Sequence, residues 1–178
     1  ERNTGSMKNE ILVVGSVALD TIKTPFGEAK EVLGGSAVYF SIAASSFAKV
    51  NVVGVVGKDF PDKYVKLLKK RKIDVTGLVK QFGKTFRWTG EYKYDLNQRE
   101  TLDLQLNVFK TFNPEIPDEY KNIKYVFLAN IDPELQLNVL KQVKNPKLVA
   151  CDTMDCWIKD KKDKVCEVLS KVDIIIIN

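Results

Sequence analysis

Short apolar runs rich in valine and isoleucine recur along the chain, and they are separated by segments with helical spacing. A short run that is apolar at successive positions is typical of a strand buried on both faces, as in a parallel sheet. These runs therefore predict the strands of a mainly parallel central sheet. They cover residues 11–17, 51–57, 124–129, 147–151 and 172–177.

The segments between the runs carry the end signals of helices. Residues 36–49 are apolar or small nearly all round, which predicts a deeply buried helix. Pro61 and Pro133 each stand where a first helical turn accepts proline, and residues 160–169 form a weaker helical pattern. Because strands and helices alternate, we expect a Rossmann-like layered α/β/α fold.

Two polar segments, residues 21–33 and 85–106, interrupt this alternation. Both carry β-branched and aromatic residues near every second position, which predicts antiparallel strands. We expect them to pair into a small β-sheet lid that projects from the main body and covers a site.

Four aromatic residues, Phe86, Trp88, Tyr92 and Tyr94, alternate along one predicted strand of this lid. They are expected to share one face because side chains in a strand alternate. That face could stack on a base or cover a sugar ring, or it could pack the lid on itself or on a partner lid.

The composition is that of an ordinary globular protein, with 44% apolar and 29% charged residues. No apolar run approaches the roughly 18 to 20 residues of a membrane helix, and the first residues lack a signal-peptide pattern. We therefore expect a cytoplasmic protein without a membrane segment. The net charge is +5, but the lysines are mostly spread along predicted helices that face water, so nucleic-acid binding is not expected.

The chain has no histidine, which excludes serine–histidine and cysteine–histidine nucleophilic schemes as well as histidine metal sites. Its three cysteines, Cys151, Cys156 and Cys166, lack C-x-x-C spacing, so neither a disulfide framework nor a zinc site is favoured. Any chemistry would depend on carboxylates, lysine, arginine, backbone amides or an added metal ion.

The two ends of the sequence predict different things. Residues 1–7 are polar and patternless, and we expect a tag or a disordered terminus. Residues 8–178 are expected to be the amino-terminal part of one α/β domain. The run 174–177 suits an interior strand, yet only one residue follows it, so we expect the fold to be incomplete there.

Three motifs in order carry a family resemblance: Gly15-Ser-Val-Ala-Leu-Asp20 after the first strand, Gly34-Gly35 before a helix, and Val-Gly-Val-Val-Gly-Lys-Asp59. Over residues 8–178 the chain resembles the ribokinase-like, or PfkB-family, carbohydrate and nucleoside kinases. The resemblance implies ATP-dependent phosphorylation of a sugar hydroxyl with Mg²⁺, with this chain holding the substrate-binding half. It also implies a possible homodimer through the lid.

Asp20 and the glycine pair are the strongest candidate site residues. Asp20 follows the first strand, at the edge where α/β sheets gather ligands, and a carboxylate there can accept hydrogen bonds from two neighbouring hydroxyls. Residue type alone would favour a simpler interpretation, in which Asp20 begins a turn. Gly34 and Gly35 let the backbone approach a ligand, and the next helix is expected to direct its free amide groups to the same place.

The resemblance extends the substrate site to Ser36, Tyr39 and Trp88. Tyr39 stands where the family commonly has asparagine, which suggests a different or larger substrate such as a nucleoside.

The resemblance also suggests roles for polar residues after the later strands. Asn130 and Asp132 are candidate substrate ligands, and Asp152 is expected near the transferred phosphate. Asn178 matches the first residue of an Asn-x-x-Glu motif that helps to organise magnesium. The family's Gly-Ala-Gly-Asp motif, which supplies the aspartate base, does not occur in these residues, so the fragment is expected to be inactive.

Other functions stay open at this point. An adenosine-like nucleoside kinase and a non-catalytic sugar-binding domain both agree with the residues above. A dinucleotide-dependent oxidoreductase is disfavoured because no G-x-G-x-x-G follows the first strand, and a P-loop is absent from the sequence.

Overall fold

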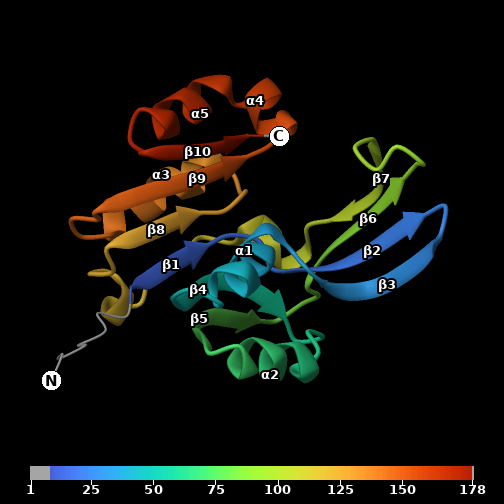
Figure 1. Cartoon of the computed structure of the whole chain (residues 1–178), viewed down its shortest axis with the longest axis horizontal. Coiled ribbons are helices and arrows are strands. Elements are labelled where there is room, and N and C mark those ends of the chain that lie inside the picture. Colours follow the sequence, from blue (N-terminus) through green and yellow to red (C-terminus); the bar gives the residue numbers. More distant parts are fainter. Residues whose placement is uncertain (1–8, 178) are drawn as a thin grey trace, which may run out of the picture.

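The computed structural model describes residues 9–177 and has a central sheet of parallel strands. The predicted tag at residues 1–7 lies outside this range. The strand order is β10-β9-β8-β1-β4-β5, which confirms the layered fold with a mainly parallel central sheet (Figure 1). The strands are β1 (Glu10–Val14), β4 (Lys49–Gly57), β5 (Ile73–Gln81), β8 (Tyr125–Leu128), β9 (Leu148–Thr153) and β10 (Ile174–Ile177).

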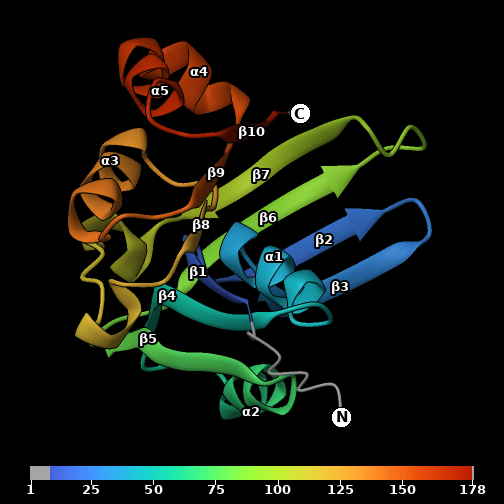
Figure 2. The ribbon, with the colours of Figure 1, turned by 60° about the vertical axis from the view of Figure 1, so that its left-hand side comes forward.

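Helices cover both faces of the central sheet (Figures 1 and 2). Helices α1 (Ser36–Ala44) and α2 (Asp62–Lys70) pack on the face that contains Val13. Leu12 and Val14 point to the opposite face because side chains alternate along a strand. That face is covered by α3 (Pro133–Gln142), α5 (Lys162–Leu169) and the 3₁₀ turns η1 (Asn107–Thr111) and η2 (Asp118–Tyr120). None of the helices within residues 9–177 is long and apolar enough to cross a membrane.

Three details of the central layer differ from the sequence-based expectation. The predicted helix over 36–49 ends at Ala44, and it is not deeply buried because only its sheet-facing side, with Ala37 and Val38, is covered. Strand β5 was not predicted, since polar residues interrupt its apolar positions at this edge of the sheet. The helix predicted over 160–169 is α5, which begins at Lys162, and the short helix α4 (Asp155–Asp160) that precedes it was not predicted.

The predicted small sheet projects from one side of the body (Figure 1). Its strands, in the order β3-β2-β6-β7, are β2 (Ala18–Thr24), β3 (Gly27–Gly34), β6 (Phe86–Tyr92) and β7 (Arg99–Gln105). Each hairpin is antiparallel, but the inner strands β2 and β6 pair in parallel, so a purely antiparallel sheet was the wrong expectation. The reason is that β2 follows β1 and β6 follows β5, so both strands leave the same edge of the central sheet in the same direction.

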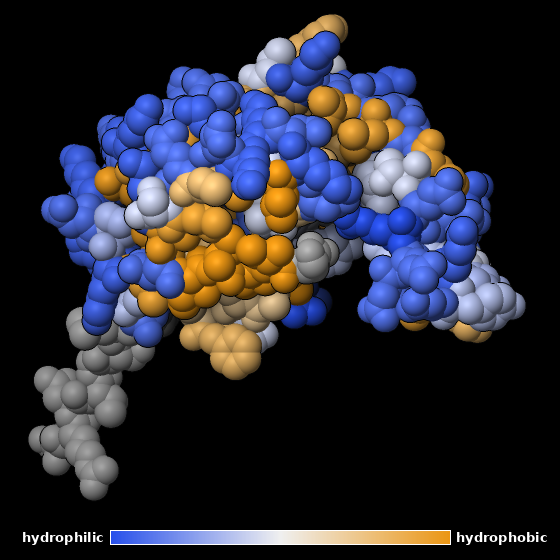
Figure 3. Space-filling model, turned by 90° about the horizontal axis from the view of Figure 1, so that it is seen from above, coloured by the Kyte–Doolittle hydropathy of each residue, from blue (hydrophilic) through white to orange (hydrophobic). Residues whose placement is uncertain are grey.

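Strand β10 lies at the end of the central sheet and pairs with β9. Its four isoleucines, Ile174–Ile177, are between 36% and 53% exposed. Apolar side chains gather over this strand in the space-filling view (Figure 3).

Candidate functional site

The candidate site lies at the carboxyl edge of the central sheet, where the strand order reverses. From β1 the chain continues to β4 on one side, and it later returns to β8 on the other side. Crevices at such a switch point are where open α/β sheets bind ligands. The small sheet starts from this edge because β2 follows β1 after only Gly15–Val17, so it stands beside the switch point.

Asp20 lies near the base of the small sheet and is almost completely buried, with 7% of its surface exposed. Its neighbours in the sheet are Val32 on β3 and Trp88 on β6. Burial raises the pKa of the Asp20 carboxyl to about 6, and a hydrogen bond from the backbone amide of Gly35 partly offsets this effect. The structure therefore supplies a buried carboxylate that is ionised at neutral pH and held by the backbone.

The glycine pair makes room for this carboxylate. A Cβ atom at Gly34 would collide with the Asp20 carboxylate, and one at Gly35 would collide with the carbonyl of Ser16. Gly35 also has φ +97°, a conformation that favours glycine. The structure thus brings Asp20, Gly34 and Gly35 together at one point of the rim.

The start of α1 differs from the expectation of free amide groups. The amide of Ser36 donates to Ser16 Oγ (3.0 Å), and the amide of Ala37 donates to the Ser16 carbonyl (3.2 Å). The Ser36 hydroxyl donates to the Asn130 carbonyl (3.2 Å). Ser36 therefore joins α1 to the ends of β1 and β8, and its own amide and that of Ala37 are already bonded within the protein.

Tyr39 lies in the first turn of α1 and is 54% exposed. Partial burial raises the pKa of its hydroxyl, and the nearby charges of Asp20 and then Tyr92 raise it further. Tyr39 is therefore near both the buried carboxylate and the small sheet, where its ring can border a ligand.

Trp88 stands beside Asp20 on the same face of the small sheet, since the two residues pair directly in the parallel β2–β6 register. Its ring covers Gly90, where any Cβ would collide with it, and its Nε1–H donates to Thr101 Oγ1 (3.1 Å). The Tyr92 ring lies 6.4 Å away, edge to face. An aromatic surface therefore adjoins the carboxylate.

The other two aromatic residues in this prediction pack against other parts of the molecule. Phe86 stacks on Phe109 of η1 at 5.1 Å, so it joins the small sheet to the body. Tyr94 lies beyond the end of β6 and contacts Phe26 of the other hairpin, with ring centroids 6.0 Å apart. Of the four, Trp88 is the direct neighbour of Asp20, and Tyr92 packs against Trp88 farther along β6.

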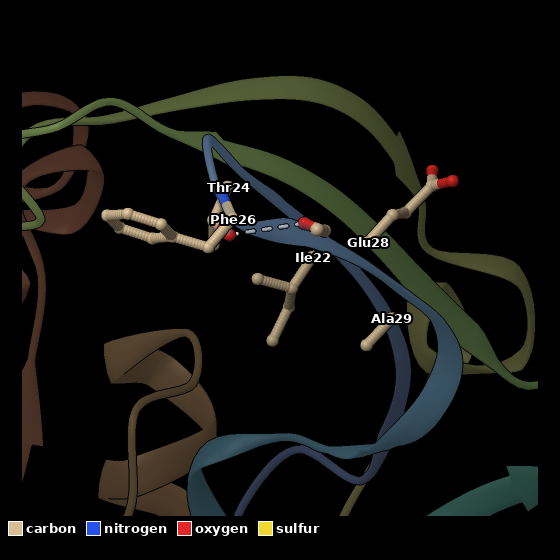
Figure 4. A pocket seen from close by; sticks show the side chains of 6 residues that line it. Ile22, Thr24, Phe26, Glu28 and Ala29 are labelled. Atoms are coloured by element: carbon tan, nitrogen blue, oxygen red, sulfur yellow. Dashed lines mark hydrogen bonds between the residues drawn. The ribbon is translucent and has the colours of Figure 1, made fainter.

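A shallow concavity lies farther out on the β2–β3 hairpin (Figure 4). Ile22 and Ala29 point to the same side, and Thr24 Oγ1 donates to the Gly27 carbonyl (3.1 Å) at the turn. It offers apolar surface and contains none of the candidate site residues.

A second polar cluster lies at the ends of β8 and β9. Burial raises the pKa of the Asp152 carboxyl, while the backbone amides of Thr153 and Asn130 partly offset this effect. The Asn130 side chain donates to Met154 Sδ (2.9 Å), and its buried Oδ1 has no hydrogen-bond partner among residues 9–177. Asn130 and Asp152 are therefore close together, and the Ser36 bond to Asn130 connects them to α1.

Gln136 on α3 fixes this cluster, although no sequence motif singles it out. It is buried, and its Nε2 donates to the carbonyls of Ala129 (3.1 Å) and Asp152 (3.0 Å). Its position three residues after Pro133 resembled an ordinary place in a helix.

Asp132, a predicted substrate ligand, caps one helix and pairs with a lysine in the structure. Its carboxylate caps α3 by accepting from the Glu134 amide (3.0 Å), and it pairs with Lys161 at 2.6 Å. Both interactions hold helices, so this carboxylate is already engaged within the protein.

Few side chains among residues 9–177 are grouped in a way that could bind a metal ion. Within residues 9–177, no group of three or more cysteine, aspartate or glutamate side chains could hold a metal ion. Asn178, predicted near magnesium, lies outside the described residues. Asp152, which the sequence resemblance places near the transferred phosphate, is a single carboxylate and does not make a metal site by itself.

No protein-family model matches the chain, but known kinases are similar to it in sequence and in structure. The cytidine kinase of Thermococcus kodakarensis is 28% identical over 173 residues, which cover 95% of this chain and 61% of that protein. The nucleoside kinase of Methanocaldococcus jannaschii, described as an archaeal member of the ribokinase family, has a TM-score of 0.71 at 20% identity. That match covers 96% of this chain and 60% of the other.

The fructokinase of Xylella fastidiosa, solved with bound ATP, has a TM-score of 0.72 at 14% identity and covers 95% of this chain and 61% of its own. These matches confirm the ribokinase-like fold and the resemblance stated from the sequence. The chain spans 61% of the length of the curated relative.

Proposed function

We propose that this chain forms the substrate-binding portion of an ATP-dependent kinase of the ribokinase family, which phosphorylates a hydroxyl group of a nucleoside or a sugar. The observation that carries this proposal is the buried Asp20 carboxylate, held against Gly34 and Gly35 at the switch point of the sheet. An ionised carboxylate in this position can accept hydrogen bonds from two neighbouring hydroxyls.

A nucleoside is favoured over a free sugar. Trp88 stands beside Asp20 on the same face and Tyr92 packs against Trp88, so a flat base can stack on these rings while the ribose hydroxyls bond to Asp20. Tyr39 borders the same space from α1. The similarity to a cytidine kinase supports this choice, whereas a sugar kinase would need Asp20 but not the aromatic surface.

The proposed reaction transfers the γ-phosphoryl group of ATP to the bound hydroxyl. ATP with Mg²⁺ supplies the phosphoryl group and neutralises its charge. This chain would contribute orientation: Asp20 holds the alcohol, and Asp152 with the Asn130 amide lies at the neighbouring strand ends. No residue of this chain is assigned as the base, because the Gly-Ala-Gly-Asp motif is absent from its sequence.

A binding and transfer assay tests the proposal. The 178-residue chain would be screened by thermal shift against cytidine, adenosine, inosine, ribose and fructose, because a ligand that binds the folded state raises its stability. We expect nucleosides to stabilise the chain more than free sugars. Transfer of labelled phosphate from ATP would then be measured with the native-length protein. Binding without transfer would favour the non-catalytic sugar-binding alternative, and equal shifts from all compounds would contradict the proposed pocket.

We also propose that two copies associate through their small sheets. Phe26, Tyr94, Leu102 and Leu104 are each at least 45% exposed on this sheet, which is an unusual concentration of apolar side chains. Light scattering after size exclusion should give a dimer mass for the chain, and Phe26→Ser with Tyr94→Ser should reduce it to that of a monomer.

A further inference from the structure

Arg87 lies behind Asp20, on the opposite face of the small sheet. In the parallel pairing of β2 and β6, Leu19 stands beside Arg87, and Asp20 stands beside Trp88. Since successive side chains alternate, Arg87 and Leu19 face away from the side that carries Asp20 and Trp88. Leu19 is buried in the core of the body, so this rear face contacts the body at the base of the sheet.

The Arg87 guanidinium bridges carboxylates on separate parts of the molecule. Its Nη1 pairs with Asp59 Oδ2 (2.8 Å), just after β4 of the body, and its Nε pairs with Glu31 Oε1 (2.7 Å) on β3 of the small sheet. Nη1 also donates to the carbonyl of Thr85 (3.0 Å), where the chain enters β6, and Asp59 Oδ1 accepts from the Thr85 amide (2.7 Å). The Arg87 side chain is only 21% exposed, so these bonds are sheltered in part from water.

Glu31 occupies an irregular position next to Asp20. It has φ +48°, and the β2–β3 register shifts between Asp20 and Ile22, which marks a bulge. A residue other than glycine keeps a positive φ only where its surroundings hold it there. Here the Glu31 amide donates to Thr21 Oγ1 (3.3 Å), its carbonyl accepts from the Tyr64 hydroxyl of α2 (3.0 Å), and its carboxylate pairs with Arg87.

We propose that Arg87 is a positioning residue for ligand binding. Its bridge between Asp59 and Glu31 fixes the bulge and the angle of the small sheet, and thereby holds the Asp20 carboxylate at the rim of the central sheet. The ligand part of this inference rests on the function proposed above, whereas the bracing of the sheet does not depend on any ligand.

Amide hydrogen exchange tests the bracing without a ligand. Arg87→Met keeps the bulk of the side chain but removes its charge and its donors. Exchange in β2 and β6 should rise about tenfold in this variant, because these strands lose two charge-assisted interactions. Arg87→Lys can reach one carboxylate at a time and should restore part of the protection. The matched control is Lys80→Met, which removes the exposed Lys80–Asp62 pair (3.6 Å) and should leave both strands unchanged.

Titration with cytidine tests the positioning. The Kd should rise about tenfold in Arg87→Met, less in Arg87→Lys, and less than about twofold in Lys80→Met. Glu31→Gln, which leaves the Asp59 contact intact, provides the same comparison if Arg87→Met does not fold. Unchanged exchange in both Arg87→Met and Glu31→Gln would overturn the proposal. Raised exchange with no cytidine binding, even by the unsubstituted chain, would support the brace and contradict the proposed function instead.

Discussion

Replacing Asp20 by asparagine should stabilise the folded chain at neutral pH. Burial raises the pKa of this carboxyl from 3.8 to about 6, so the folded state prefers its protonated form. Protonated Asp20 therefore contributes to the free energy of unfolding. This contribution is fully present below the pKa of Asp20 in the unfolded chain, and it is lost as the pH rises through the folded-state pKa of about 6. Asparagine has nearly the same shape and never ionises, so it avoids the loss.

The magnitude follows from the size of the shift. A difference of roughly two pKa units corresponds to about 3 kcal/mol at a pH where the carboxylate is fully charged in both states. Asp20 is almost completely buried, so solvent screening reduces this value little. The free energy of unfolding of Asp20→Asn should therefore exceed that of the unsubstituted chain by about 2–3 kcal/mol at pH 7.5, and by less than about 1 kcal/mol at pH 4.

Urea denaturation at the two pH values, at constant ionic strength, measures this difference. Other titrating groups are common to both proteins and cancel in the comparison. Asp62→Asn is a suitable control because the Asp62 side chain is 82% exposed, and it should change stability little at either pH. A stability difference between Asp20→Asn and the unsubstituted chain that is the same at pH 4 and pH 7.5 would refute the assignment of Asp20 as a buried, charged group.

Three further predictions concern the same site. Gly35→Ala should lower the free energy of unfolding by more than about 2 kcal/mol, because the new Cβ would meet the Ser16 carbonyl and the backbone has φ +97°. Gly27→Ala is the control: Gly27 also has a positive φ, but a Cβ there meets open space, so the loss should be smaller. Urea denaturation measures both variants, and equal losses of stability would contradict the close approach at Gly35. Trp88→Ala should weaken cytidine binding by about tenfold and should change ribose binding little, because only cytidine has a base to stack on the ring. Calorimetry measures both affinities, and an equal loss of affinity for cytidine and ribose would argue against base stacking. Affinity for the nucleoside should fall about tenfold for each pH unit below 6, as Asp20 takes up a proton, and a flat profile from pH 7 to 5 would contradict recognition by the carboxylate.

The sequence was most informative where one short segment determines the geometry. Asp20 and the glycine pair could be anticipated because a buried strand, a carboxylate and two glycines follow one another within 25 residues. The projecting sheet could be anticipated from the polar segments that interrupt the apolar runs, whereas the strand order and strand β5 were not predicted.

Roles predicted for single residues were less dependable, because the contacts of each side chain are set by residues on other elements of the fold. The amides at the start of α1 are taken by Ser16, and Asp132 is used as a helix cap, although both features suggested a ligand. Gln136 and Arg87 could not be found from the sequence, since their partners lie on other elements of the fold.

The most direct test of the site is a calorimetric titration that compares cytidine with 2′,3′-dideoxycytidine. If the Asp20 carboxylate holds neighbouring ribose hydroxyls, removing both should weaken binding by about 100-fold or more, because each hydrogen bond to a charged group contributes about 1.5–3 kcal/mol. Equal affinities for the two compounds would contradict the assignment of Asp20 and Gly34–Gly35 as the hydroxyl-binding centre.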